Sequence, residues 1–227
     1  MRTVLAVSVA VCLAHLSLPA LSQGMPMACG DLANHYGPFD YRTSQQDLKI
    51  VESGHFPAYV EALARRKTGP LGTDIGYVLH TSPNHHRALV SMMRLAEREK
   101  RDMPLGARYS VDCYFERALR FRPDDTVARL LYCNHLVRRT RYDEARTQLK
   151  LAKEQAADNG LTHYNIGLLY FDMKDYDAAR QQAHIASKLG HPGTGLKTQL
   201  EAVGQWQEDS AVKAVAPQPT LTVQPTQ

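Results

Sequence analysis

The stretch "YNIGLLYFDMKDYDAAR", Tyr164 to Arg180, decides the fold class. It is rich in tyrosine, it contains a single glycine, and its apolar rhythm is interrupted around Lys174 and Asp175. Tyrosines gathered in this way have two interpretations, a catalytic pocket or one half of a structural repeat. A structural repeat must recur at a fixed spacing, so the rest of the chain distinguishes the two.

A second copy of the pattern lies upstream. The segment "YDEARTQLKLA", Tyr142 to Ala152, aligns with "YDAARQQAHIA", Tyr176 to Ala186, with tyrosine, aspartate and small residues in register. The equivalent alanines Ala145 and Ala179 are 34 residues apart. A period of this length is typical of stacked helical hairpins.

This register resembles that of the tetratricopeptide repeat (TPR). The resemblance covers the chain from about Tyr109 to Trp206 and is most specific over residues 126–159 and 160–192. It implies an all-α fold, a right-handed α-solenoid of antiparallel helical hairpins.

The TPR pattern assigns the opening stretch to packing. The first helix of a unit needs large apolar residues at helical spacing and one small residue where its partner helix approaches. Ile166, Gly167 and Tyr170 take these places, and Cys133 takes the place of Gly167 in the preceding repeat. A glycine inside a helix costs about 1 kcal/mol relative to alanine, which close helix packing offsets. The stretch is therefore interpreted as half of a repeat.

The ends of the array need separate treatment. Upstream of the repeats, short amphipathic helices such as "FPAYVEALARR" match the TPR pattern weakly. Downstream, we expect a terminal helix that covers the exposed edge of the last repeat, with Leu196, Leu200, Val203 and Trp206 along one stripe. The expected order is a signal peptide (1–22), an irregular segment (23–44), a divergent helical cap (45–85), TPR-like repeats (86–192), a capping helix (193–207) and a disordered tail (208–227).

The amino terminus has the layout of a secretory signal. Arg2 precedes an apolar run from Val4 to Leu16, and small residues lead to an expected cleavage site after Ser22. The run is too short to span a bilayer, which needs about 20 residues, and we expect no transmembrane segment. A lipoprotein anchored at Cys29 is the alternative, but Pro26 stands where a lipobox has leucine. The protein is therefore expected to be periplasmic or secreted.

The carboxy terminus, "AVAPQPTLTVQPTQ", has no periodic apolar face and is expected to be disordered. The formal net charge of the chain is +4, and part of the excess lies between Arg138 and Lys153. This mild charge favours an acidic partner slightly and does not indicate nucleic acid.

Three cysteines remain after removal of the signal, which is the count for one bridge and one free thiol. Cys133 already has a role as the small residue at a helix contact. Elimination pairs Cys29 with Cys113, which would attach the irregular segment to the array. A Cys113–Cys133 bridge is the alternative, because the turn at Pro123 brings these residues to similar height.

The sequence lacks the motifs of an enzyme. His85 and His86 are adjacent and point in different directions, and no zinc spacing, nucleophile elbow or phosphate loop is present. Asn84 and His85 are expected at a turn and a helix start, and Asp124 and Asp125 at another helix start. We expect no metal, no cofactor and no catalytic activity.

The TPR resemblance implies a partner-binding surface along the first helices. Asparagines there could bond an extended peptide, and arginines could pair with its carboxylates. The expected partner is an envelope protein or peptide, bound through a concave basic groove by an adaptor or assembly factor. The positions are Arg87, Arg94, Arg98, Val127, Leu130, Asn134, Arg138, Tyr164, Asn165, Leu168 and Phe171.

A second hypothesis concerns the amino-terminal aromatics. "CGDLANHYGPFDYR" and "SPNHHRAL" are similar to segments of uncharacterised proteobacterial secreted TPR proteins. Tyr36, Phe39 and Tyr41 could form a carbohydrate or small-molecule site, or serve an enzyme-associated role, although such rings more often dock a segment to the core. An open cleft flanked by His35 and Asp40 would favour the second hypothesis.

Overall fold

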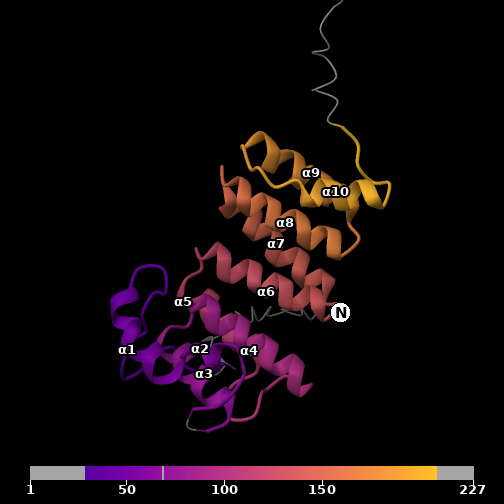
Figure 1. The fold of residues 1–227 in the computed structure, drawn as a ribbon. Helices are drawn as coiled ribbons and strands as arrows, with labels where there is room; N and C mark the ends of the chain where they lie inside the picture. Colours follow the sequence, from indigo (N-terminus) through magenta and orange to yellow (C-terminus); the bar gives the residue numbers. More distant parts are fainter. Residues whose placement is uncertain (1–28, 68, 209–227) are drawn as a thin grey trace, which may run out of the picture.

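The computed structural model describes residues 29–67 and 69–208. The predicted signal peptide and the predicted tail beyond residue 208 lie outside these residues. Within them the fold is entirely helical, with ten α-helices and no strand, which confirms the all-α prediction (Figure 1). The helices are α1 (Gln45–His55), α2 (Ala58–Glu61), α3 (Leu71–Thr81), α4 (His86–Glu99), α5 (Val111–Phe121), α6 (Thr126–Arg138), α7 (Tyr142–Ala156), α8 (Gly160–Asp172), α9 (Tyr176–Lys188) and α10 (Gly195–Ala202).

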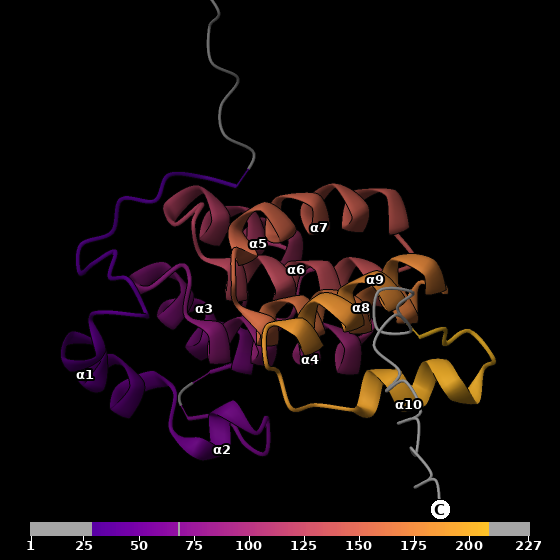
Figure 2. The same ribbon diagram turned by 90° about the horizontal axis from the view of Figure 1, so that it is seen from above.

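The helices are arranged as in a helical-repeat protein. Helix α6 packs most closely on α7, and α8 on α9, as hairpins with short turns. Helices α4, α6 and α8 lie next to one another, and α5 and α7 lie together along one side of them (Figures 1 and 2). Helix α10 packs against both α8 and α9.

The 34-residue period recurs in the backbone bonds that begin and end the helices. Asp125 and Asn159 start α6 and α8, and each accepts a hydrogen bond from the amide three residues ahead. Thr140 and Lys174, also 34 residues apart, end these helices in the left-handed region, with φ of 56° and 60°. Each hairpin is therefore delimited by the same local chemistry.

The small residues of the repeat lie where the helices touch. Cys133 is fully buried, and its Sγ lies 4.0 Å from the carbonyl oxygen of Ala145. A Cβ on Gly167 would lie 3.3 Å from the carbonyl oxygen of Ala179 and 2.5 Å from Leu196 Cδ2. Only glycine leaves room there for both α9 and α10.

Buried polar residues follow the same register. The Arg129 guanidinium donates to Gln148 Oε1 (2.6 Å) and to the Pro123 carbonyl (2.7 Å). In the next hairpin, His163 bonds Gln182 Oε1 (2.8 Å) and the Ala157 carbonyl (3.0 Å). Two different side chains thus satisfy equivalent groups, a correspondence that the amino-acid alignment did not reveal.

The terminal helix is shorter than predicted. Helix α10 ends at Ala202, and Gly204 then adopts a φ of +69°, which turns the chain back. Leu196 and Leu200 are fully buried as expected, but Val203 is 44 % exposed. Trp206 lies beyond the helix, so the prediction of one helical stripe including Val203 and Trp206 is wrong.

The region before α4 forms three helices, of which α2 is a single turn. Leu63 follows it with a φ of +57°, which stops the helix. The carbonyl of Glu61 accepts a hydrogen bond from Ser91 Oγ (3.0 Å). The α2 segment therefore lies against α4. None of the described helices combines the length and apolar character needed to cross a membrane.

A disulfide joins Cys29 to Cys113, and Cys133 is free and buried. This is the pairing obtained by elimination, and it rules out the Cys113–Cys133 alternative. Arg117 reinforces the attachment by donating to the carbonyls of Cys29 (2.9 Å) and Asp31 (2.6 Å). Because a lipid anchor would occupy the same Cys29 sulfur, the bridge and the anchor exclude one another.

We expect Cys113→Ser to lower the free energy of unfolding by about 4 kcal/mol, because the bridge closes a long loop between residues 84 apart. Urea denaturation measures the change, with Cys133→Ala as the control that leaves the bridge intact. Burial raises the pKa of Cys133 to about 12, so its thiol should react with alkylating agents only on unfolding. Loss of less than about 1 kcal/mol on removing the bridge would contradict the prediction.

Candidate functional site

The predicted binding residues lie on three neighbouring helices, α4, α6 and α8, whose shared outer surface we call the α4–α6–α8 face. The helices are in contact in this order. The structure places Arg87, Arg94 and Arg98 on α4, Val127, Leu130, Asn134 and Arg138 on α6, and Tyr164, Asn165, Leu168 and Phe171 on α8.

The α6 and α8 part of the face is both apolar and polar. Asn134 and Asn165 are half-buried, and neither side chain has a hydrogen-bond partner among the described residues. An amide offers two donors and an acceptor, so both can bond an extended backbone. Around them lie half-buried apolar side chains that pack on the core beneath, namely Leu130, Tyr164, Leu168 and Phe171.

The α4 part of the face is more occupied than expected. Arg87 pairs with Glu61 and lies 3.6 Å from Glu52, and Arg98 donates to the Leu63 carbonyl (2.6 Å). Both arginines therefore hold the α2 segment in place. Arg94 is exposed and has no hydrogen bond or ion pair to any residue that the structure describes. Of the three predicted arginines on α4, it is the one available to a partner.

Arg138 is also paired, but at the surface. Its guanidinium bonds Glu97 on α4 through two contacts of 2.6 and 2.9 Å, and its side chain is 54 % exposed. Exposed pairs of this kind are worth no more than about 1 kcal/mol. A carboxylate on a partner can therefore compete with Glu97.

A buried polar network attaches the amino-terminal segment to the helices. Asn84 is fully buried, and its Nδ2 donates to Asp40 Oδ1 (2.8 Å) and Asp125 Oδ2 (2.7 Å). Its Oδ1 accepts from the Tyr41 amide (3.0 Å). Arg42 and Arg122 each donate to Asp40 Oδ2 at 2.8 Å.

The predicted roles at the helix starts agree with this network. His85 Nδ1 accepts from the Ala88 amide (3.2 Å) at the start of α4, and Asp125 Oδ1 accepts from the Ala128 amide (3.0 Å) at the start of α6. His86 Nε2 lies 2.9 Å from Asp125 Oδ2. The sequence reasoning identified the two caps and missed that Asn84 connects them.

The electrostatics of the network favour ionised carboxylates. Hydrogen bonding from Arg42 holds the pKa of Asp40 well below its usual range, and Asn84 adds to the effect. Burial opposes ionisation of Asp125, but hydrogen bonds from His86, the Ala128 amide and Asn84 prevail and lower its pKa. Both carboxylates are therefore charged and fully used within the fold.

The aromatic segment is mostly docked. The Tyr41 ring packs on His85 and His86, with ring centroids 4.3 and 4.9 Å away. The Phe39 amide donates to the Thr81 carbonyl (2.8 Å). Asp40 is only 7 % exposed and is bonded within the network, so it does not flank an open cleft with His35.

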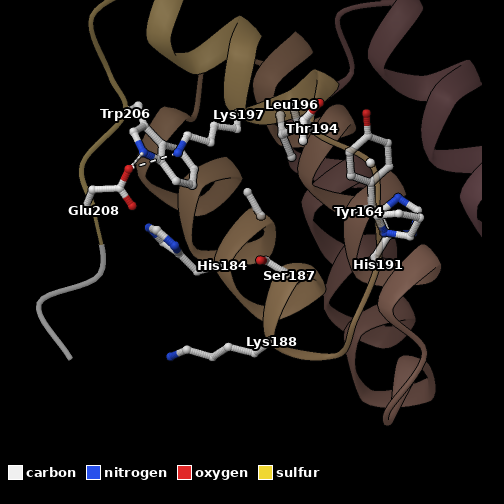
Figure 3. Close-up of a pocket in the computed structure, with 13 residues that line it drawn as sticks. Tyr164, His184, Ser187, Lys188, His191, Thr194, Leu196, Lys197, Trp206 and Glu208 are labelled. Carbon is white, nitrogen blue, oxygen red and sulfur yellow. Dashed lines mark hydrogen bonds and ion pairs between the residues drawn. The ribbon is translucent and has the colours of Figure 1, made fainter. Parts of the chain in front are cut away.

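A cavity of about 300 Å³ lies at the carboxy-terminal end (Figure 3). It is enclosed by the start of α8, by α9 and α10, and by the chain after α10. Glu208 accepts from Trp206 Nε1 (3.0 Å) and from Lys197 Nζ (2.9 Å), which holds this last segment over the helices. Tyr164 packs against His191 with ring centroids 4.5 Å apart, and it connects the cavity to the α4–α6–α8 face.

One group of potential metal ligands comes together in the described part of the chain, namely Cys29, Cys113 and Glu116. Its two sulfurs are bonded to each other. They therefore offer no thiolate to a metal ion.

Neither a protein-family model, nor a curated protein, nor a solved structure matches this chain. The assignment of function therefore depends on the chain's own residues.

We expect Asp40→Asn to lower the free energy of unfolding at neutral pH by about 2 kcal/mol, because the charged hydrogen bonds are lost. The folded pKa of Asp40 lies below its unfolded value. Its stabilisation is therefore present above the unfolded pKa and is lost as the pH falls through the folded value. The difference from the unmodified protein should shrink below about pH 4.

Urea denaturation across this pH range measures the effect. Asp124→Asn is the matched control, because the Asp124 side chain is 67 % exposed and should contribute less than about 1 kcal/mol. A difference for Asp40→Asn that is independent of pH would contradict the prediction.

Proposed function

We propose that this chain is an exported TPR-type adaptor or assembly factor that binds a peptide or protein of the cell envelope along the α4–α6–α8 face. One observation carries the proposal. Arg94, Asn134 and Asn165 stand without partners among the described residues, on three helices that touch in sequence, beside half-buried apolar side chains. A surface that combines unused polar groups with apolar area suits an extended segment.

The TPR part of the proposal is supported by the period itself. The helix starts at Asp125 and Asn159, the left-handed ends at Thr140 and Lys174, and the close contacts at Cys133 and Gly167 all recur after 34 residues. In such arrays the first helices line the surface that takes the partner.

The expected partner chemistry is acidic. Arg94 is unpaired among the described residues, and Arg138 exchanges readily with solvent-exposed carboxylates. A carboxylate-bearing segment along the face would meet both, and bidentate pairing with arginine would orient it.

Export is supported by two independent features. Met1 to Ser22 has the sequence pattern of a secretory signal, and the structure contains a disulfide between Cys29 and Cys113. Disulfides persist in oxidising compartments such as the periplasm. The proposed location is therefore periplasmic or secreted.

The alternative, a carbohydrate or small-molecule site or an enzyme-associated role built on the whole aromatic segment, receives less support. Tyr41 and Phe39 are used to attach the segment to the helices. Asp40 is enclosed by its own ion pairs.

We expect capture of an envelope partner by the mature protein to depend on the two free amides. The double variant Asn134→Ala, Asn165→Ala should reduce binding about tenfold or more, since each amide supplies roughly 1 kcal/mol of hydrogen bonding. Gln181→Ala, which removes an exposed amide on α9, is the matched control. A partner retained equally by all three proteins does not use the face.

We also expect Arg94→Glu to weaken binding of the captured partner more than Lys150→Glu, because Lys150 lies on α7, outside the face. Titrations at two salt concentrations measure this, and the difference should diminish at high salt because screening weakens exposed charge contacts. Equal affinities of the two variants, or affinity indifferent to salt, would show that the partner binds elsewhere.

A further inference from the structure

A second concave region lies between α1 and α3, outside the α4–α6–α8 face. It consists of two adjoining hollows, of about 260 and 300 Å³, that share His55 and Tyr77 as lining residues. The rings of these two residues pack together with centroids 4.1 Å apart. We call the two hollows the α1–α3 groove. Their joint size lies within the range of small-molecule sites, roughly 300–1,000 Å³.

One hollow is apolar and open. It is lined by Tyr36, Ile50, Val51, Gly54, His55 and Tyr77. Ile50 is 69 % exposed, and Tyr77 and Tyr36 are 44 % and 38 % exposed. Single exposed apolar side chains are ordinary, but a group of them around one hollow indicates a binding surface.

The other hollow is polar. His55 Nδ1 lies 3.3 Å from Asp74 Oδ1, and Asp74 also accepts from the Lys67 amide (3.3 Å). Tyr114 lines the same hollow, and its hydroxyl oxygen accepts from the Arg108 amide (3.3 Å). The Tyr114 hydroxyl proton is thus directed away from that amide and can be donated.

His80 has an unused polar atom in this hollow. Its Nε2 is buried, without a hydrogen-bond partner in the part of the chain that the structure describes. Leaving such an atom unsatisfied costs about 1–3 kcal/mol. A ligand group in the hollow would remove this cost.

Positive charge is in excess around the hollow. Arg108 lines it and has no ion pair within the described residues, while the nearby Arg117 is 2 % exposed and donates to backbone carbonyls. Burial, followed by the charges of Arg117 and Arg108, lowers the pKa of His80 to about 4. The imidazole is therefore neutral at pH 7 and can donate from one nitrogen. The Asp74 carboxylate is fully buried and already engaged by His55.

We propose that the α1–α3 groove binds a small amphipathic carboxylate, with its apolar chain on Tyr36, Ile50 and Tyr77 and its carboxylate toward Arg108 and His80. The apolar hollow gains from burial of the chain. The unpaired guanidinium and the unsatisfied imidazole nitrogen supply donors for the head group. This site is independent of the peptide-binding proposal, because the two surfaces have no residue in common.

The chain offers a variant that blocks the groove without disturbing the fold. Gly54 lies in α1 and lines the apolar hollow, and a Cβ built there meets no atom within 4 Å. Gly54→Leu should therefore fill the hollow, while replacement of a helical glycine maintains or raises stability. Gly54→Ala is the matched control, since a single methyl leaves the hollow largely open.

The experiment is calorimetric titration of the mature protein with octanoate, and in parallel with octan-1-ol, with melting temperatures recorded for every variant. We expect saturable octanoate binding that Gly54→Leu weakens about tenfold or more and Gly54→Ala leaves nearly unchanged. Arg108→Gln should weaken octanoate binding about tenfold and leave octanol binding unaffected. Arg101→Gln, an exposed arginine outside the groove, should change neither.

Three results would overturn the proposal. They are absence of saturable octanoate binding, octanoate affinity that is unchanged in folded Gly54→Leu, and equal affinity for octanoate and octanol together with no effect of Arg108→Gln. Retention of the envelope partner by Gly54→Leu distinguishes failure of this site from failure of the peptide-binding face.

Discussion

The buried amide of Asn84 connects three parts of the chain that are distant in sequence. It donates to Asp40 in the amino-terminal segment and to Asp125 at the start of α6, and it accepts from the Tyr41 amide. Two carboxylates this close would repel each other in a buried site. A neutral donor between them, with arginines on the outer side of Asp40, turns that repulsion into attachment.

This connection has consequences for the binding surface. Asp125 also caps α6, and His85, next to Asn84, caps α4, so the network fixes the starts of two adjacent helices relative to each other. Arg94 and Asn134 lie further along these helices and keep their relative positions for the same reason. On the other side, the α2 segment occupies Arg87 and Arg98. The attached amino-terminal region thus limits the face to its α6 and α8 part and to Arg94.

Local and periodic features of the sequence predicted the helices best. The alignment of Ala145 with Ala179 predicts the α6–α7 and α8–α9 hairpins, since the period depends on residues close in the chain. Counting cysteines identified the partner of Cys113. The role of Asn84 was not predictable, because its bonds cross 44 and 41 residues and follow no period. The covering of α4 by Glu61 and Leu63 was missed for the same reason, and the end of α10 depended on the conformation of Gly204.

Amide hydrogen exchange in Asn84→Leu tests most directly whether one side chain couples these parts. The substitution keeps a similar volume and removes every hydrogen bond of the amide, and Asn165→Leu, at a half-buried asparagine without a partner in the described residues, is the control. The account predicts that the amides of Tyr41 and Ala128, one in the attached segment and one at the start of α6, lose protection together by about tenfold or more. Unchanged protection of Ala128, with loss confined to Tyr41, would contradict it.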